Sequence, residues 1–200
     1  MIFLDGALPG ILSGLESLGA ENDLRMVERS QKSLNLERPT AELLYILVTS
    51  ARRRHILEIG TSNGYSAIWL ASALRETEGR PLLTIEHSPH KAAQAKANLK
   101  EASLQDWVHV IEGDATSVCA ALAGPFDCVF FDADRVSASK QLEHLLPKLT
   151  EDALLLADNA LSHPDEIADY ISRVEALQAF DTVTVPVGKG LHIARRRRQS

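Results

Sequence analysis

The sequence has few of the features that mark membrane proteins or nucleic-acid-binding proteins. No stretch approaches the roughly 20 consecutive apolar residues that a membrane-spanning helix requires. The first ten residues, MIFLDGALPG, lack the basic and apolar segments of a signal peptide. The 21 lysines and arginines are outnumbered by 27 aspartates and glutamates, which gives a net charge of −6. Because nucleic-acid-binding surfaces are basic, we expect neither a nucleic-acid partner nor a membrane partner.

Cysteine is also scarce. The chain has only Cys119 and Cys128, without the C-x-x-C spacing of redox and zinc motifs. Both have apolar neighbours, so we expect buried, reduced thiols in a cytoplasmic protein. The one basic run, RRRR at residues 195–198, is predicted to be a solvated tail.

The sequence lacks internal linkers, repeats and low-complexity segments. Its 200 residues therefore predict one domain over residues 1–200. We expect N-terminal helices over residues 1–52 and a cofactor-binding α/β core over residues 53–196. The helices are predicted within residues 8–52, with a break near residues 35–39. The apolar positions at helical spacing in the first of them are Leu12, Leu15, Leu18, Leu24 and Val27.

The order of the later elements indicates the fold class. Strands and helices alternate from residue 55 onward, which predicts a doubly wound, mostly parallel sheet of seven strands. The last two strands are joined only by residues 188–190, too few for a crossover helix, so a C-terminal antiparallel hairpin is expected. The predicted strands are 55–60, 82–86, 107–112, 126–131, 153–157, 179–186 and 190–195, and the predicted helices are 64–77, 89–102, 115–122, 137–148 and 164–177.

One stretch, HILEIGTSNGYSAIWLA at residues 55–71, predicts a strand, a glycine turn and a helix. This layout places a ligand at the carboxyl end of the first strand of a doubly wound sheet. Gly60 and Gly64 permit a sharp turn and the close approach of a ligand, both of which a Cβ would obstruct. A glycine turn after the first strand also occurs in α/β proteins of other functions, which is the alternative interpretation.

The spacing within this stretch reads E-x-G-x-x-x-G and differs from the G-x-G-x-x-G that binds a dinucleotide. Glu58 is poorly placed beside a pyrophosphate and suits a cationic, amine-bearing ligand. The stretch resembles motif I of the class I S-adenosylmethionine-dependent methyltransferases. Its fuller form, LEIGTSNGYS, is similar to the branch that contains catechol and caffeoyl-CoA O-methyltransferases.

Acidic residues follow each of the first four predicted strands. Glu86 can accept the hydroxyl protons of a ribose, and Asp114 with Ala115 can border an adenine ring. Glu58 and Asp132 supply negative charge for the sulfonium and α-amino groups of a methyl donor. The alternative is that each acid caps the following helix, which for Asp114 is an equally good interpretation.

A second group of polar residues follows two strands that should be neighbours. Asp132 ends the strand in FDCVFFDADR at residues 126–135, while Asp158 and Asn159 end the strand in LLLADNA. Two carboxylates and an amide oxygen suit a hard divalent ion, above all Mg²⁺. The set is similar to the metal ligands of the catechol and caffeoyl-CoA O-methyltransferases, in which the metal ion binds two adjacent substrate oxygens. Ordinary turn formation by aspartate and asparagine is the alternative.

The resemblance covers roughly residues 36–195 and implies a homodimer acting on a small, catechol-like molecule with adjacent hydroxyls. It also implies that Leu36 packs over the cofactor. The cofactor contacts that it implies are Glu58, Gly60, Thr61, Gly64, Tyr65, Ser66, Glu86, Asp114, Ala115 and Asp132, and the implied metal ligands are Asp132, Asp158 and Asn159.

One departure from the family affects the mechanism. The family usually has D-A-D-K, with the lysine as the proposed general base, and this chain has Arg135 at that position. A guanidinium stays protonated in proteins, so Arg135 can stabilise an anionic acceptor or orient an acidic substrate but cannot accept a proton. Asp132 and Arg135 are therefore the catalytic candidates. His163 is either a base or, more in keeping with a loop histidine, a residue without a chemical role, and Lys140 is expected to be a solvated surface charge. Activation of the hydroxyl by the metal alone is the further alternative, so the base stays unassigned.

These features predict an S-adenosylmethionine-dependent O-methyltransferase that uses a divalent metal, with Mg²⁺ expected. A metal-independent methyltransferase of the same fold is the nearest alternative. A protein that binds NAD or a nucleotide sugar on a doubly wound sheet is a second, and a non-catalytic cofactor-binding protein is a third.

Overall fold

A computed structural model gives the fold of the chain and describes residues 2, 4–28 and 31–198. Its centre is a seven-stranded sheet with the strand order β3-β2-β1-β4-β5-β7-β6. Strands β1 to β5 run parallel, whereas β7 pairs antiparallel with both β5 and β6. The strands are β1 (Ile56–Ile59), β2 (Leu82–Glu86), β3 (Val108–Glu112), β4 (Phe126–Phe131), β5 (Leu149–Ala157), β6 (Phe180–Val185) and β7 (Leu191–Arg196).

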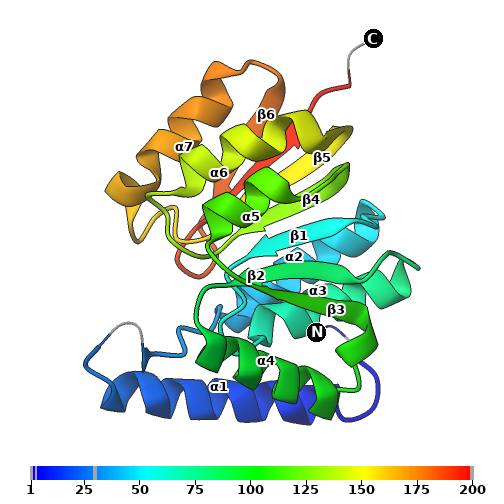
Figure 1. Cartoon of the computed structure of the whole chain (residues 1–200), viewed down its shortest axis with the longest axis vertical. Helices are drawn as coiled ribbons and strands as arrows, with labels where there is room; N and C mark the ends of the chain where they lie inside the picture. Colours follow the sequence, from blue (N-terminus) through cyan, green and yellow to red (C-terminus); the bar gives the residue numbers. More distant parts are fainter. Residues whose placement is uncertain (1, 3, 29–30, 199–200) are drawn as a thin grey trace.

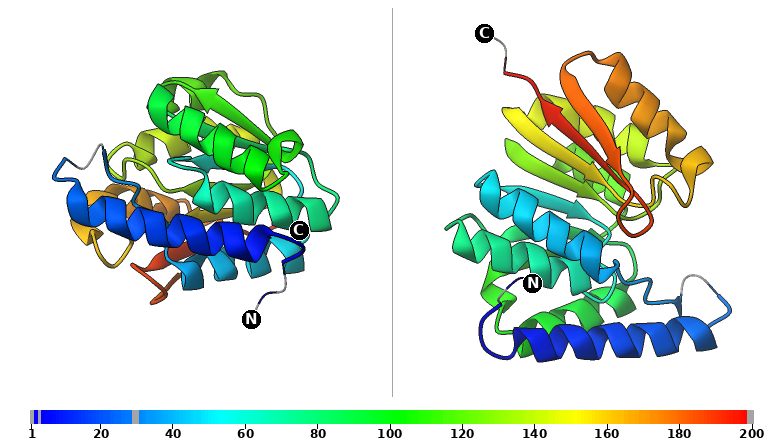
Figure 2. Two further views of the ribbon diagram at one scale, coloured as in Figure 1. Left: turned by 90° about the horizontal axis from the view of Figure 1, so that it is seen from below. Right: turned by 180° about the vertical axis from the view of Figure 1, so that it is seen from behind.

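Helices cover both faces of the sheet (Figure 1). Helices α5, α6 and α7 lie on one face, and α2 and α3 lie on the other, as the view from behind in Figure 2 shows. Helix α1 runs along the end of the molecule where α4 and β3 lie. The helices are α1 (Leu8–Arg25), α2 (Arg38–Ser50), α3 (Tyr65–Glu76), α4 (Pro89–Glu101), α5 (Ala115–Ala121), α6 (Ala138–Leu145) and α7 (Pro164–Ala176).

The core divides between the two faces of the sheet, because successive residues of a strand point to opposite sides. On β1, Ile56 packs with α2 and α3, whereas Leu57 and Ile59 pack with α6 and α7. Helix α3 is buried from Tyr65 to Leu74, so it is the most enclosed of the helices described. No helix of the described part of the chain is long and apolar enough to span a membrane.

The structure confirms the predicted doubly wound sheet and the C-terminal antiparallel hairpin, with strand bounds that differ mainly at β5. That strand begins at Leu149, four residues before the predicted start at 153. The prediction for the C-terminal basic run was only partly correct, because Arg197 and Arg198 are exposed beyond the last strand but Arg195 and Arg196 lie in β7. Arg196 lies in β7, and its guanidinium donates hydrogen bonds to the carbonyl oxygens of Leu149 and Thr150 at 3.2 and 3.4 Å.

The apolar positions of the first helix were only partly predicted. Leu12 and Leu15 are buried in the core, as their helical spacing indicated. Leu18, by contrast, is 63% exposed, and Leu24 is 88% exposed near the end of α1. Val27 lies beyond the helix, which ends at Arg25, and is 91% exposed. The buried leucines of α1 therefore lie in its first half, and Gly19 is the one buried residue described in its second half.

Candidate active site

A cavity of about 870 Å³ lies where the carboxyl ends of β1, β2, β4 and β5 meet. Its volume is in the range of small-molecule and cofactor sites. The predicted site residues that line it are Leu36, Gly60, Thr61, Tyr65, Ser66, Glu86, Asp132, Arg135, Asp158, Asn159 and His163. Four other predicted site residues, Glu58, Gly64, Asp114 and Ala115, lie outside this lining.

The turn after β1 requires glycine for a reason that the sequence did not indicate. Gly60 has φ +104°, and an added Cβ would lie 2.4 Å from the backbone carbonyl oxygen of Asp132. Gly64 has φ +88°, and its Cβ would lie 3.2 Å from the Cβ of Ala95. At both positions the glycine approaches another segment of the protein, Asp132 after β4 or Ala95 of α4. The turn thereby brings the end of β1 against the end of β4.

Glu58 lies fully buried beneath the cavity. The hydroxyl of Thr84 donates to its Oε2 at 2.6 Å, and the hydroxyls of Thr61 and Thr84 are also 2.6 Å apart. Since the single Thr84 proton is used on Glu58, Thr61 donates to Thr84. Burial raises the pKa of Glu58 to about 7, although the hydroxyls of Ser66 and Thr84 oppose the rise. Glu58 is thus connected to the cavity wall through Thr61.

Glu86, at the end of β2, is fixed by the backbone. The N–H of Ser62 donates to its Oε2 at 2.8 Å, and the N–H of Ser88 donates to its Oε1 at 2.9 Å. A carboxylate has about four acceptor sites, so both oxygens keep capacity for further donors. Because Glu86 also lines the cavity, it can accept hydrogen bonds from a ligand with adjacent hydroxyls.

Asp114 is the N-cap of α5. Its Oδ1 accepts hydrogen bonds from the N–H and the hydroxyl of Ser117 at 2.8 and 2.7 Å, and these bonds lower the pKa of the Asp114 carboxyl. The alternative interpretation of this residue is therefore the one that the structure shows. The contact of Asp114 and Ala115 with an adenine ring stays a prediction.

Asp132, Asp158 and Asn159 converge at the ends of β4 and β5, as predicted. Burial first, and then the charges of Asp158 and Glu58, raise the pKa of Asp132 well above its usual range. Burial likewise raises the pKa of Asp158 to about 6, against the hydrogen bonds that it accepts from Asn159. One oxygen of Asp158, Oδ1, is buried without a hydrogen-bond partner.

This group of oxygens fits a hard divalent cation. Carboxylates whose pKa values are raised by burial and by neighbouring acids are stabilised in their charged form by a nearby cation. The partnerless Oδ1 of Asp158 is free to be a ligand, and carboxylate and amide oxygens are the ligands that Mg²⁺ prefers. Within the described ranges, no group of three or more histidine, cysteine, aspartate or glutamate side chains is placed to hold a metal. The set proposed here has two carboxylates, and its third donor is the amide of Asn159.

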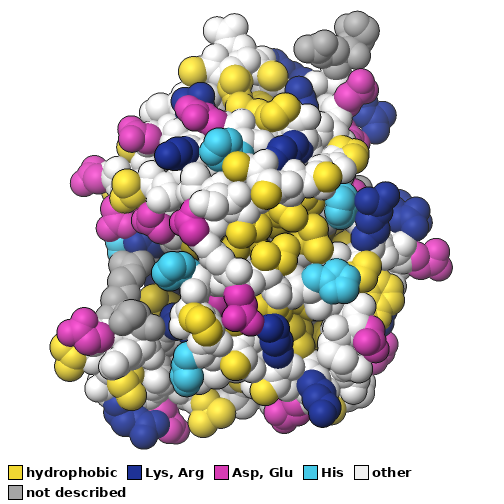
Figure 3. All heavy atoms as spheres, viewed as in Figure 1, with side chains coloured by type: hydrophobic (Ala, Val, Ile, Leu, Met, Phe, Trp, Pro, Cys, Tyr) yellow, Lys and Arg dark blue, Asp and Glu magenta, His cyan; other side chains and the backbone are white. Residues whose placement is uncertain are grey.

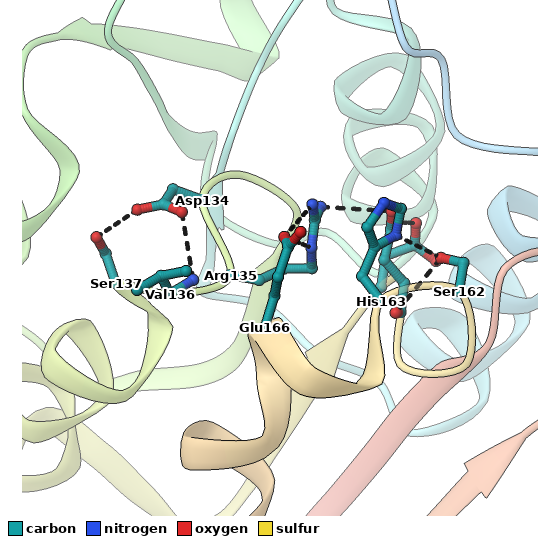
Figure 4. Close-up of polar contacts among 9 residues, drawn as sticks. Asp134, Arg135, Val136, Ser137, Ser162, His163 and Glu166 are labelled. Carbon is teal, nitrogen blue, oxygen red and sulfur yellow. Dashed lines mark hydrogen bonds and ion pairs between the residues drawn. The ribbon is translucent and has the colours of Figure 1, made fainter. Parts of the chain in front are cut away.

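Arg135 is buried at the edge of this group, with 8% of its surface exposed. Its Nε and Nη2 donate to Oε2 of Glu166 at 2.8 and 2.5 Å, and its Nη1 donates to Oδ1 of Asn159 at 3.4 Å (Figure 4). Sequence reasoning missed Glu166. The available signal was its position in the first turn of α7 after Pro164, where an acid is favoured by the helix dipole.

The other predicted polar residues divide between the cavity and the surface. His163 lines the cavity beside the first turn of α7, and its Nδ1 is 2.9 Å from the hydroxyl of Ser162 (Figure 4). Lys140 is exposed on α6, as predicted. Asp134 closes its own turn by accepting hydrogen bonds from the N–H of Val136 and the hydroxyl of Ser137. His163 therefore reaches the site and Lys140 does not line it.

The N-terminal segment forms one wall of the cavity. The hydroxyl of Tyr65 donates to Glu16 of α1 at 2.5 Å, and the side chain of Asn35 donates to the carbonyl oxygen of Leu15 at 2.8 Å. The hydroxyl of Ser62 donates to the carbonyl oxygen of Ser33 at 2.6 Å. These bonds hold the segment after α1 over the glycine turn. Its residues in the lining are Val27, Lys32, Leu34, Asn35 and Leu36.

The C-terminal hairpin supports the opposite wall. The N–H of Ala160 donates to the carbonyl oxygen of Gly190 at 2.9 Å, and the N–H of Leu161 donates to that of Lys189 at 3.0 Å. Lys189 also pairs with Glu37, at the start of α2, at 2.7 Å. The turn between β6 and β7 therefore holds the loop that follows Asn159 and ties it to the N-terminal helices.

The rim of the site beside α7 is acidic. Figure 3 shows aspartate and glutamate side chains gathered at the left edge of the view, over the beginning of α7, where Asp165 and Glu166 are exposed. Two cations of the lining are paired with acids, Arg135 with Glu166 and Lys189 with Glu37. This part of the surface therefore does not favour an anionic ligand.

Comparison with known proteins identifies similar chains. A family model described as a methyltransferase domain matches residues 57–160. The chain is 34% identical over 165 residues to the catechol O-methyltransferase of Niastella koreensis, which covers 80% of this chain and 72% of that protein. It is 33% identical over 160 residues to the catechol O-methyltransferase of Mycobacterium tuberculosis, which covers 80% and 70% of the two chains.

Among solved structures, the chain is similar to an O-methyltransferase from Bacillus cereus in complex with S-adenosylhomocysteine. The TM-score is 0.81 at 25% identity, and the match covers 98% of this chain and 93% of the other. The likeness extends over the whole sheet, including the C-terminal hairpin. It supports the predicted resemblance, which was made from the glycine turn and the two acidic strand ends.

Proposed function

The chain belongs to the S-adenosylmethionine-dependent O-methyltransferases of the catechol O-methyltransferase type, and from this we propose that it methylates a catechol-like acceptor with a divalent cation. The proposed cation is Mg²⁺, held by Asp132, Asp158 and Asn159. The observation that carries the proposal is geometric: Asp132, Asp158 and Asn159 line one wall of the cavity at the ends of β4 and β5, and Oδ1 of Asp158 is buried there without a hydrogen-bond partner.

The charges expected in the reaction match those of the site. When bound, S-adenosylmethionine supplies the methyl group and a divalent cation supplies charge that favours a deprotonated acceptor. We assign Glu86 to the ribose hydroxyls, because its carboxylate is fixed by two backbone donors and lines the cavity. Glu58 and Asp132 supply the negative potential for the cationic end of the methyl donor. The remaining assigned contacts are Gly60, Thr61, Gly64, Tyr65, Ser66, Asp114 and Ala115.

The chain's other contribution is to orient the reactants and exclude water. Methyl transfer from a sulfonium to a deprotonated hydroxyl is an in-line displacement in which two opposite charges are neutralised, so alignment and a dry site favour it. Arg135 takes no proton from the acceptor, because its guanidinium stays charged and donates to Glu166 and Asn159. It acts on the acceptor through charge alone.

The part of the site beside α7 and the β6–β7 turn favours a neutral acceptor. The donors of Arg135 are directed to Glu166 and Asn159, and Lys189 is paired with Glu37, so neither cation is offered to an acidic substrate. The acidic rim beside α7 adds to this preference. We therefore propose an uncharged or amine-bearing molecule with adjacent hydroxyls in preference to a carboxylic acid. We also propose a cytoplasmic homodimer that binds no nucleic acid, as the family resemblance and the net charge of −6 imply.

The proposal is tested by calorimetric titration with S-adenosylhomocysteine, with and without Mg²⁺, followed by turnover of a panel of catechols. We expect S-adenosylhomocysteine, the product of methyl transfer from S-adenosylmethionine, to bind without the metal, and we expect methyl transfer to require the metal. Absence of S-adenosylhomocysteine binding would exclude the proposed activity.

A metal-independent methyltransferase of the same fold is the second candidate. One observation favours it: Arg135 already donates a hydrogen bond to Oδ1 of Asn159, one of the proposed ligand atoms. Full turnover in EDTA, retained in Asp158→Ala, would support this candidate and exclude the metal-assisted one.

A further inference from the structure

Arg135 and the proposed metal compete for one atom. Nη1 of Arg135 donates to Oδ1 of Asn159 at 3.4 Å, while Nδ2 of the same asparagine donates to Oδ2 of Asp158. The amide of Asn159 is therefore oriented by its two neighbours, with its oxygen toward the guanidinium. That oxygen is the atom that the proposed set offers to a divalent cation.

The guanidinium cannot leave this position freely. Arg135 is 8% exposed, and two of its nitrogens, Nε and Nη2, are bonded to one oxygen of Glu166. Glu166 lies in the first turn of α7, so its position is fixed by a helix that packs through Ile167 and Tyr170. Arginine is also charged at every pH at which the protein is folded. A permanent positive charge therefore lies beside the proposed ligand atom.

We propose that Arg135 is a positioning residue that weakens divalent-cation binding at Asp132, Asp158 and Asn159, and that Glu166 offsets this effect as its counter-ion. The inference rests on the proposed metal site. The charges of Arg135 and Glu166 then set how tightly the cation is bound, although neither residue supplies a proposed ligand atom. Such a pair makes metal binding weak and reversible in the resting protein.

The physical reason is the repulsion of like charges in a partly buried site. A guanidinium and a divalent cation that contact the same oxygen repel each other, and water screens them little because the surroundings are buried. At separations of several ångströms, one unit of charge changes the affinity for a divalent cation by roughly tenfold or more. Removal of the positive charge should therefore tighten binding, and removal of the counter-ion should loosen it.

The competing explanation is that Arg135 binds an anionic group of the acceptor. Its geometry opposes this, because the donor edge formed by Nε and Nη2 is directed at Glu166, and Nη1 already donates to Asn159. An acceptor carboxylate could use the Nε and Nη2 edge only by displacing an internal carboxylate that is already bonded at 2.5 and 2.8 Å. The internal pair is therefore the better-supported arrangement.

The test is the affinity for Mn²⁺, titrated as MnCl₂ into the full-length protein with excess S-adenosylhomocysteine. Free Mn²⁺ is read from its electron paramagnetic resonance signal. We expect Arg135→Gln to bind Mn²⁺ roughly tenfold more tightly than the wild type and Glu166→Gln to bind it roughly tenfold more weakly. The double variant, which has lost both charges, should return to near the wild-type affinity.

A matched control is available on the same helix. Arg173 of α7 pairs with Glu143 of α6 at 2.7 Å, and neither residue lines the cavity. Arg173→Gln and Glu143→Gln change the charge in the same way and should leave the Mn²⁺ affinity unchanged. Thermal unfolding of each variant, read by circular dichroism, identifies any that fail to fold, and Arg135→Met then replaces Arg135→Gln.

The outcomes separate this inference from the proposed function. Opposite shifts in the two single variants support it, whereas equal affinities, or weaker binding in both, overturn it and leave the metal site intact. Binding by Arg135→Gln alone, without binding by the wild type, supports the inference and removes the resident metal from the proposed function. Binding of Mn²⁺ by neither protein overturns both the inference and the metal site. S-adenosylhomocysteine binding reports separately on the cofactor site, on which the proposed function rests.

Discussion

Gly60 and Asp132 are in backbone contact, because an added Cβ on Gly60 would lie 2.4 Å from the carbonyl oxygen of Asp132. The end of β1 and the end of β4 are therefore packed too closely to leave room for a side chain at residue 60. Any side chain at residue 60 must displace the residue that we assign to both the cofactor and the metal. Gly60 also has φ +104°, a backbone conformation that residues with a side chain rarely adopt.

Gly60→Ala should destabilise the protein by about 2–5 kcal/mol, because it combines an unfavourable φ with a steric clash. It should also abolish S-adenosylhomocysteine binding. Urea unfolding and calorimetric titration measure the two effects. Gly14→Ala is the control, because its added Cβ meets nothing within 4 Å in the middle of α1 and should stabilise the protein by about 0.5–1 kcal/mol. Normal ligand binding by Gly60→Ala would contradict the packing described.

Glu58 should make the ligand-free protein less stable as the pH rises. Its folded pKa is raised from 4.5 to about 7, so between these values the folded state holds a proton that the unfolded state has lost. The stabilisation is fully present below 4.5 and is lost by about pH 7. A shift of this size corresponds to about 3 kcal/mol.

Glu58→Gln isolates this effect from those of Asp132 and Asp158, whose raised pKa values act in the same direction. The variant should match the wild type near pH 4.5 and exceed its free energy of unfolding by about 3 kcal/mol at pH 8. Urea denaturation at the two pH values measures the difference. A difference that does not change with pH would show that burial does not perturb Glu58.

Asp158→Asn should remove the metal dependence of turnover. It keeps the shape of the side chain but replaces a negative ligand by a neutral one, so methyl transfer should fall by roughly a hundredfold or more. Addition of EDTA to the wild type should give a similar loss, and S-adenosylhomocysteine should still bind. Asp165→Asn, an exposed acid on α7 that does not line the cavity, is the control. Unchanged turnover in Asp158→Asn would exclude the proposed ligand.

Glu86→Gln should weaken S-adenosylhomocysteine binding by about tenfold to a hundredfold. Glu86 now accepts hydrogen bonds from two backbone N–H groups, and the NH₂ of the glutamine side chain would face one of them, donor against donor. Glutamine also lacks the negative charge that strengthens hydrogen bonds from ligand hydroxyls. Titration calorimetry measures the loss. Glu112→Gln is the matched control, since Glu112 ends the neighbouring strand beside Glu86, pairs with Lys96 on the surface and does not line the cavity.

The parts of this site that could be predicted are those set by strand ends. Glu86, Asp132 and Asp158 directly follow apolar runs, and parallel strands bring such residues to one edge of the sheet. The alternation of elements likewise fixed the fold class. The sequence could not decide whether Asp114 caps a helix or contacts a cofactor, because the same position both follows a strand and precedes a helix.

Other features depend on contacts between distant segments. Glu166 is 31 residues from Arg135 in the chain, and its approach is set by the packing angle of α7. The exposure of Leu18 and Leu24 depends on how far α1 extends past the body of the protein, which their spacing does not encode. Arg196 was assigned to a tail because its partners, the carbonyls of Leu149 and Thr150, belong to the part of β5 that lies before the apolar run.

The hairpin that holds the loop after Asn159 has a consequence for how the protein matures. Lys189 and Gly190 accept the hydrogen bonds that fix this loop, and Lys189 also reaches back to Glu37. Strands β1 to β5 precede this segment in the chain, so they are synthesised before it. The hydrogen bonds that fix the loop after Asn159 can form only once residues 189 and 190 have been added.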